Sequence, residues 1–79
     1  MIEAVPRSYS SWQVPGLREA RWARMWTQRD LAARAKVSLA TIVRLENGES
    51  AQAGTIRKLA RALGVPTETL MTEPENPEP

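Results

Sequence analysis

Residues 28–45, QRDLAARAKVSLATIVRL, contain two short helical patterns joined by a tight turn, and this stretch decides the fold. Each half places small or aliphatic residues on one face: Leu31, Ala32 and Ala35 in the first, Ile42 and Leu45 in the second. Two short helices that cross steeply with a small residue at their contact form a helix-turn-helix. We therefore predict this motif, with Ala32 at the contact.

Both helices carry their own start signal. Thr27 can cap the first helix, and Asp30, three residues later, supplies the acid of a capping box. Ser38 can cap the second helix, with Val37 in the turn between the two. The pair Asn47–Gly48 is typical of a helix C-terminus and ends the second pattern.

The second helix has a small, basic face opposite its apolar residues. This face comprises Ala40, Val43, Arg44 and Asn47, with Leu39 and Thr41 on its flanks near the helix N-terminus. It contains no acid and one arginine, so it can enter a major groove without steric or electrostatic conflict. Alone, the same pattern would favour an ordinary amphipathic surface helix. Its place in a capped helix-turn-helix favours DNA.

Residues 17–71 resemble the Cro and phage-repressor (XRE) type of helix-turn-helix domain. The pattern TQxxLAxxAxVSxxTIxRLENG begins at Thr27, Arg21 precedes it, and the run TIRKLARALGV follows at residues 55–65. A pattern of this length is far more specific than a short motif. The resemblance implies an all-α, compact five-helix, lambda-repressor-like domain. It also implies binding to double-stranded DNA, usually as a homodimer on a palindromic operator.

The resemblance assigns roles to individual residues. Arg21 and Glu46 match a family ion pair, which we expect to be structural and to tie the first helix to the third. Gln28 occupies the family's phosphate-contact position, beside the positive end of its helix. The DNA-binding residues predicted here are Gln28, Lys36, Ser38, Leu39, Ala40, Thr41, Val43, Arg44 and Asn47.

Two positions depart from the family pattern. Lys36 stands where the family usually has a glycine of positive φ, and a left-handed lysine costs about 1 kcal/mol. Either the turn is reshaped, or the strain is accepted in return for another positive charge. The predicted loop 49–54 contains Glu49 and no base, where the family often has Lys or Arg to meet phosphate. Fewer ionic contacts to DNA are therefore expected. This leaves open a fold retained without DNA binding.

We predict three segments: an N-terminal arm at 1–16, the helix-turn-helix domain at 17–71, and a disordered, acidic, proline-rich tail at 72–79. Besides the two central helices, the domain is expected to have helices at 17–25 and 55–63 and a last helical turn at 66–71. In the family, the region from the fourth to the fifth helix often forms the dimer contact. The candidates here are Thr67, Leu70 and Met71, although Leu70 can equally be core.

The arm has two interpretations. Val5, Tyr9, Trp12 and Val14 are too apolar for a solvated tail, which favours docking on the domain, on a second subunit or on another protein. A partly disordered arm is the alternative. Trp22 either makes an exposed contact or is covered by the arm. Together these features support a second hypothesis, an antitoxin or adaptor whose arm and Trp22 bind a partner protein, with or without DNA binding.

Composition excludes several classes of function. The 79 residues suit one domain, and they include no cysteine and no histidine. Nucleophilic triads, thiolates and the commoner metal sites are therefore excluded, and no enzyme, cofactor or metal is expected; a Ser–Lys mechanism is the least implausible exception. No signal peptide or membrane-spanning run is found, so we expect a soluble, cytoplasmic protein without a membrane partner.

Charge is divided along the chain. Residues 17–63 contain ten Lys and Arg against four acids, whereas residues 64–79 contain four acids and no base. A basic body with an acidic tail suits a polyanionic partner for the body, although many soluble domains have such an excess. The function predicted from all these features is a sequence-specific, double-stranded-DNA-binding transcriptional regulator acting as a repressor.

Overall fold

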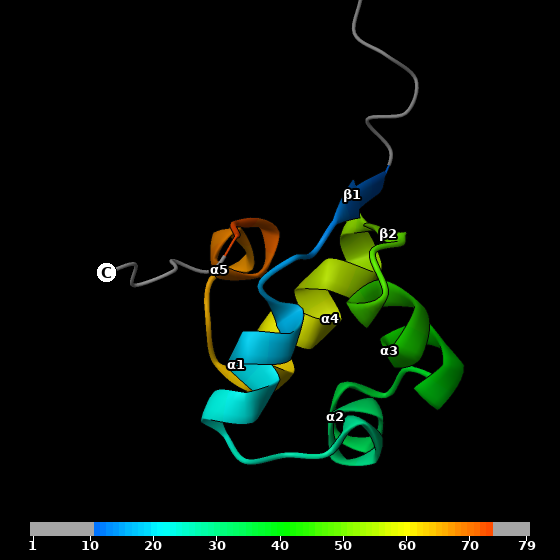
Figure 1. Cartoon of the computed structure of the whole chain (residues 1–79), viewed down its shortest axis with the longest axis vertical. Coiled ribbons are helices and arrows are strands. Elements are labelled where there is room, and N and C mark those ends of the chain that lie inside the picture. Colours follow the sequence, from blue (N-terminus) through cyan, green and yellow to red (C-terminus); the bar gives the residue numbers. More distant parts are fainter. Residues whose placement is uncertain (1–10, 74–79) are drawn as a thin grey trace, which may run out of the picture.

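The computed structural model describes residues 11–73, which form five helices and a two-stranded ribbon around one core (Figure 1). In chain order the elements are β1 (Ser11–Gln13), α1 (Leu17–Ala23), α2 (Gln28–Ala35), α3 (Leu39–Glu46), β2 (Ser50–Gln52), α4 (Ala53–Leu63) and α5 (Thr67–Met71). The predicted all-α, five-helix domain is confirmed, with the ribbon as a minor addition. Within the described part of the chain, no helix is both long and apolar enough to span a membrane.

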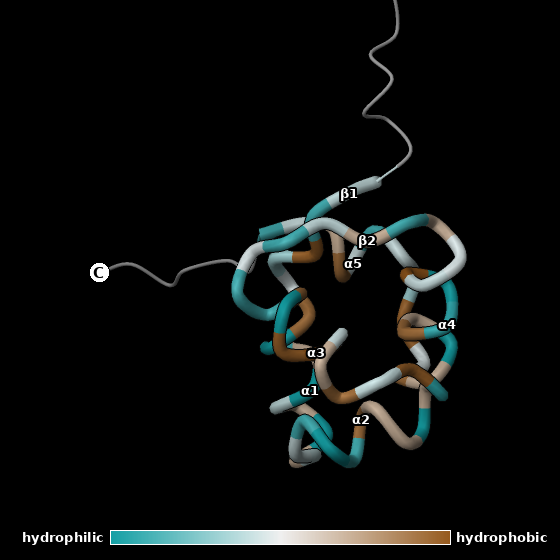
Figure 2. The backbone as a smooth tube through the Cα atoms, turned by 90° about the vertical axis from the view of Figure 1, so that its right-hand side faces the viewer, coloured by the Kyte–Doolittle hydropathy of each residue, from teal (hydrophilic) through white to brown (hydrophobic). Residues whose placement is uncertain are grey.

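The core is built from aliphatic side chains of every helix. Its buried members are Val14, Leu17, Leu31, Ala32, Ala35, Ile42, Leu45, Ala51, Ile56, Leu59, Ala60, Leu63 and Leu70. Along α2, α3 and α4 these residues recur at helical spacing, so hydrophobic and hydrophilic segments alternate in Figure 2. Ala32, the small residue predicted at the contact of the two motif helices, is buried, and α2 and α3 pack against each other.

The two-stranded ribbon was not predicted from the sequence. Strands β1 and β2 pair antiparallel, with Ser11 opposite Gln52 and Gln13 opposite Ser50. Each strand has three residues, too few for an alternating pattern to stand out. The ribbon joins residues that precede α1 to the connection between α3 and α4. Residues 1–10 of the predicted arm lie outside the described residues.

Three boundaries differ from the predictions. The predicted loop at 49–54 is instead strand β2 followed directly by α4, which begins at Ala53 rather than at Thr55. Helix α1 ends at Ala23, because Met25 takes φ 59° and the Trp26 amide donates to the Arg21 carbonyl, as in a Schellman motif. Helix α5 begins at Thr67 and ends at Met71. Of the predicted tail, residues 74–79 lie outside the described residues.

Candidate nucleic-acid interface

Side-chain caps fix the start of both motif helices. The Asp30 amide donates to Thr27 Oγ1 at 3.0 Å, and the Thr27 amide donates to Asp30 Oδ2 at 2.9 Å, which completes the capping box. The hydrogen bond from the Thr27 backbone lowers the pKa of the Asp30 carboxyl, so it stays ionised. At α3, the Thr41 amide donates to Ser38 Oγ at 3.1 Å.

The turn between the two helices is not reshaped, and of the two alternatives the strained lysine is the one found. Lys36 ends α2 in the left-handed region, with φ 61° and ψ 44°. Its backbone N–H donates to the Ala32 carbonyl, and the Val37 amide donates to the same oxygen at 3.1 Å. The side chain of Lys36 is exposed, so the strain places a cation at the solvent side of the turn.

The predicted residues around α3 divide into an exposed and a half-buried group. Ser38, Ala40, Arg44 and Asn47 are exposed, whereas Leu39, Thr41 and Val43 are half-buried. Leu39 packs against the core, and the hydroxyls of Ser38 and Thr41 lie 2.8 Å apart in a hydrogen bond. The outward surface of α3 therefore has Ala40 and Arg44 as its most accessible side chains.

A network centred on Glu46 ties α1, α2 and α3 together. Arg21 donates from Nε to Glu46 Oε2 at 2.6 Å and from Nη2 to Oε1 at 2.9 Å. Arg18 Nε donates to Oε1 at 3.3 Å, and its Nη2 donates to the Glu46 main-chain oxygen at 3.2 Å. The Glu46 side chain is 1% exposed and the Arg21 side chain 9%. The Arg21–Glu46 pair is therefore buried and joined by two hydrogen bonds.

The ionisation of this pair follows from its contacts. Burial by itself raises the pKa of Glu46, but the hydrogen bonds from Arg21 and Gln28 outweigh it, and the net pKa is lowered. The hydrogen bond to Glu46 raises the pKa of Arg21. Both side chains are charged over the ordinary pH range. Arg18 was missed by the sequence analysis, although it lies one helical turn before Arg21 on the same helix.

Gln28 lies at the N-terminus of α2, and its side-chain amide is bonded within the protein as well as facing solvent. Its Nε2 donates to Glu46 Oε1 at 3.0 Å, and the residue is half-buried. An amide nitrogen has a second N–H, so one donor remains for another acceptor. The network therefore fixes the direction in which Gln28 presents that donor.

The charged partner of Arg44 comes from the connection after α3. Arg44 Nε lies 3.5 Å from Glu49 Oε1, and the two side chains are 56% and 60% exposed. From the sequence, Glu49 was noted only as an acid in a loop where a base was expected. The structure instead places it beside the one arginine on the outward side of α3.

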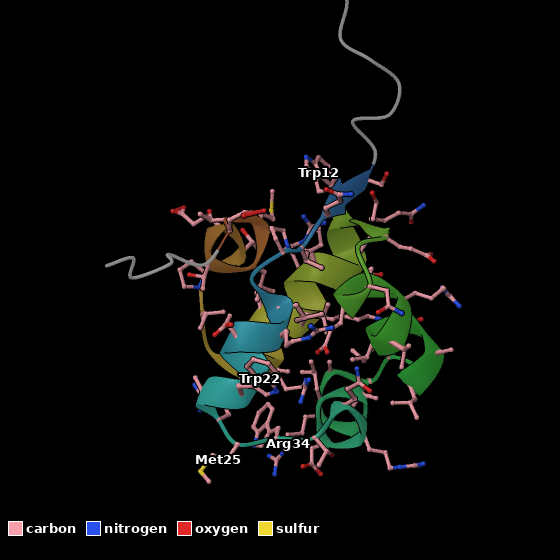
Figure 3. The ribbon with its side chains drawn as sticks, viewed as in Figure 1. Trp12, Trp22, Met25 and Arg34 are labelled. Atoms are coloured by element: carbon pink, nitrogen blue, oxygen red, sulfur yellow. The ribbon has the colours of Figure 1, made fainter. Side chains whose placement is uncertain are left out.

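Arginines from α1, the residue after it and α2 lie against two tryptophan rings. Trp22 is 54% exposed, and the guanidinium carbons of Arg18 and Arg21 each lie 5.9 Å from its ring centre. Trp26 is half-buried against the core, with Arg34 at 4.5 Å and Arg24 at 5.7 Å from its ring centre. Figure 3 shows Met25 and Trp22 at the end of the molecule remote from Trp12 and β1.

Comparisons with known proteins identify the same region. A family profile described as "Helix-turn-helix" matches residues 17–70. The chain is also similar to the uncharacterized HTH-type transcriptional regulator RghRB of Bacillus subtilis (strain 168), with 47% identity over 57 residues. That match covers 70% of this chain and 41% of the relative, so the chain spans less than half of the relative's length.

Proposed function

The chain belongs to the helix-turn-helix family of the Cro and phage-repressor type, and from this premise we propose that it is a sequence-specific, double-stranded-DNA-binding regulator of transcription that acts as a repressor. A domain bound across a promoter excludes other proteins from that DNA, which makes repression the simplest outcome of binding. The relative's description as a transcriptional regulator supports the same class of function.

The outward side of α3 is the observation that carries this proposal. Ser38 caps the helix, Ala40 leaves room at its N-terminal turn, and Arg44 follows one turn later, all three exposed. A helix with small side chains at its N-terminal end can lie deep in a major groove, where an arginine then reaches base edges. The core contacts of Ile42 and Leu45 hold the opposite side.

Positive charge near this helix supports a phosphate partner. Lys36 lies in the turn before α3, and Gln28 keeps one amide hydrogen beyond its bond to Glu46. The N-terminal turn of α4 follows directly on β2, so its free backbone N–H groups lie near the end of the α3–β2 connection. These groups position a protein on the DNA backbone, whereas base contacts decide the sequence.

A homodimer on a palindromic site is part of the proposal. Thr67 and Met71 of α5 are exposed, Met71 at 38%, and are available to a second copy. Leu70, the third candidate, is fully buried and serves the core. Two copies related by a twofold axis would then read half-sites about one helical turn apart.

A band-shift experiment with the promoter DNA upstream of the protein's own gene tests the proposal. The expected result is a shifted band that resists excess random-sequence competitor. The logarithm of the binding constant should fall with the logarithm of the salt concentration, with a slope of about −0.9 per neutralised phosphate. An affinity that stays flat from low to physiological salt rejects DNA as the partner.

The exposed Trp22 favours one second candidate, an antitoxin or adaptor that binds a partner protein. A tryptophan with half its surface in water is a common anchor in protein interfaces. Association with the protein encoded by the adjacent gene, lost in Trp22→Ala while DNA affinity is kept, would support this function. Equal association of the wild type and Trp22→Ala would exclude Trp22 from it.

A further inference from the structure

The contact between Arg44 and Glu49 occurs where an acid is least expected. Glu49 lies in the connection after α3, close to where the proposed interface meets DNA phosphates, and a carboxylate there repels them. Yet its Oε1 lies 3.5 Å from Arg44 Nε. An acid that weakens general DNA attraction needs a compensating role, and its contact with Arg44 provides one.

Backbone hydrogen bonds hold Glu49 in this position. The Glu49 amide donates to the Arg44 carbonyl at 3.1 Å, and the Gly48 amide donates to the Leu45 carbonyl at 3.1 Å. From the other side, Gln13 Nε2 donates to the Gly48 carbonyl at 2.9 Å. The next residue, Ser50, is paired with Gln13 in the β1–β2 ribbon. The main chain that carries the carboxylate is therefore fixed on both sides, although the carboxylate itself is exposed.

The geometry decides which part of the arginine stays available. A guanidinium has five N–H groups in a planar fork, and it can meet guanine either through its two terminal nitrogens or through Nε and one terminal nitrogen. The Glu49 carboxylate lies nearest the Nε side, at the distance of an ion pair. The two terminal nitrogens remain, and they match O6 and N7 of guanine in the end-on arrangement.

We propose that Glu49 is a positioning residue for base recognition: its carboxylate holds the Arg44 guanidinium by Nε, so that the terminal nitrogens bind O6 and N7 of one guanine. This inference rests on the proposed DNA-binding function and names the base that the site reads. It also gives Glu49 two opposite effects. Glu49 raises discrimination for guanine through Arg44, and it lowers affinity for all DNA through its charge.

The experiment compares Glu49→Ala and Glu49→Gln with the wild type, using the duplex that the wild type selects from random DNA and the same duplex with the predicted G·C pair changed to A·T. Glu49→Ala should reduce the affinity ratio of the two duplexes by about two- to five-fold, as expected from loss of an exposed ion pair. Glu49→Gln keeps a carbonyl acceptor at the same reach and should retain part of the ratio. Both variants should bind random DNA more tightly, because both lack the charge.

Two controls make the result specific. Glu19→Ala removes an exposed acid from α1, which carries none of the proposed DNA or dimer contacts, and should leave the ratio unchanged. In an Arg44→Ala background, Glu49→Ala should no longer change the ratio, although affinity for random DNA still rises. This double-mutant cycle separates an effect that passes through Arg44 from simple charge repulsion.

The outcomes distinguish this inference from the proposed function. If the wild type selects no sequence, the positioning role of Glu49 and the proposed sequence-specific DNA binding are both wrong. If the wild type selects a sequence and Glu49→Ala keeps the full ratio, only the positioning role is wrong. If Glu49→Ala changes the ratio equally with and without Arg44, Glu49 contacts a base itself, and the positioning role is again overturned.

Discussion

Arg21 and Glu46 are 25 positions apart in sequence, and two hydrogen bonds of 2.6 and 2.9 Å join them across the α1–α3 contact. Arg21 also donates from Nη1 to the Trp26 carbonyl at 2.8 Å, so it holds the turn after α1 as well. The first helix, the turn before α2 and the end of α3 thus share one buried charge pair. The orientation of α3, and with it the proposed interface, depends on this pair.

Removing either partner should destabilise the domain. Loss of one member of a buried pair costs about 3–5 kcal/mol, because the other charge is left without its partner. The loss of stability in Arg21→Ala should fall at the lower end of this range, since Arg18 and Gln28 still donate hydrogen bonds to Glu46. Glu46→Ala leaves two arginines facing each other and should cost at least as much. Urea unfolding measures both.

Arg18→Ala is the matched control for that experiment. Its contact to Glu46 is longer and 45% exposed on the arginine side, so the loss should stay below about 1 kcal/mol. An Arg21→Ala variant that unfolds at the same urea concentration as Arg18→Ala would show that burial of the pair contributes nothing to stability.

Acid should weaken the domain through Glu46. Its pKa is lowered in the folded protein, so its contribution to stability is fully present above the unfolded value of 4.5 and is lost as the pH falls through the folded pKa. Wild-type thermal midpoints should therefore drop below about pH 4.5. In Glu46→Gln the midpoint is lower at neutral pH and changes less on acidification. Parallel curves for the two proteins would contradict this assignment.

Much of the fold was predictable because its signals are local. Thr27 and Asp30 make their capping box within four residues. The Ser38 hydroxyl caps α3 over the same span by accepting from the Thr41 amide. The core of α2 to α4 follows from helical spacing. The family pattern marks position 36 as a turn residue of positive φ but leaves a reshaped turn as the alternative, and Lys36 has φ 61°. Interactions close in sequence therefore determined the helices and their ends.

What the sequence did not predict depends on distant pairing. Strand β1 pairs with residues 37 to 41 positions later, and Gln13 bonds to Gly48 over 35 positions. Neither strand has enough residues for a pattern, so only the folded chain shows the ribbon. Likewise, only the folded structure shows that the Glu49 carboxylate lies beside Arg44. The predicted DNA-contact residues stay predictions until binding is measured, and the predicted arm, domain and tail at 1–16, 17–71 and 72–79 also stay predictions.

Gly16 should resist any larger side chain. Its amide donates to the Leu70 carbonyl at 2.8 Å, and a Cβ built on it would collide with the Thr69 carbonyl oxygen. Because its φ of −89° suits any residue, the penalty is steric. Gly16→Ala should cost about 1–3 kcal/mol as overpacking between α1 and α5. Thermal unfolding measures the loss.

Gly54 provides the opposite case in the same molecule. It lies inside α4, and a Cβ there would meet nothing within 4 Å. Gly54→Ala should stabilise the domain by about 0.5–1 kcal/mol, because alanine loses less backbone entropy in a helix. If both alanine variants shift the melting temperature in the same direction, the close approach of Gly16 to α5 is not what limits that position.

Arg44→Ala should relax preference at a single base pair in each half-site. Arg44 is the one long cationic side chain in α3, and a bidentate contact to guanine is worth about 1–3 kcal/mol of discrimination. Leu39 and Ala40 carry no side-chain hydrogen-bonding atoms, so they meet thymine methyls or exclude bulkier edges by shape. Selection from random DNA with wild type and Arg44→Ala measures the change. An unchanged operator would remove Arg44 from base recognition.

Lys36 should lower the stability of the fold and raise its affinity for DNA, because its strained backbone presents a charge at the turn before α3. Lys36→Gly relieves the left-handed conformation and should stabilise the fold by about 0.5–1 kcal/mol. It also removes a cation, so DNA affinity should fall and the salt slope should decrease by about 0.9 if that cation neutralises one phosphate. Met25→Gly is the matched control: Met25 has φ 59° and is 90% exposed, but carries no charge. It should gain similar stability in urea and keep the wild-type salt slope. Equal slopes for all three proteins would mean that the charge of Lys36 does not reach the DNA.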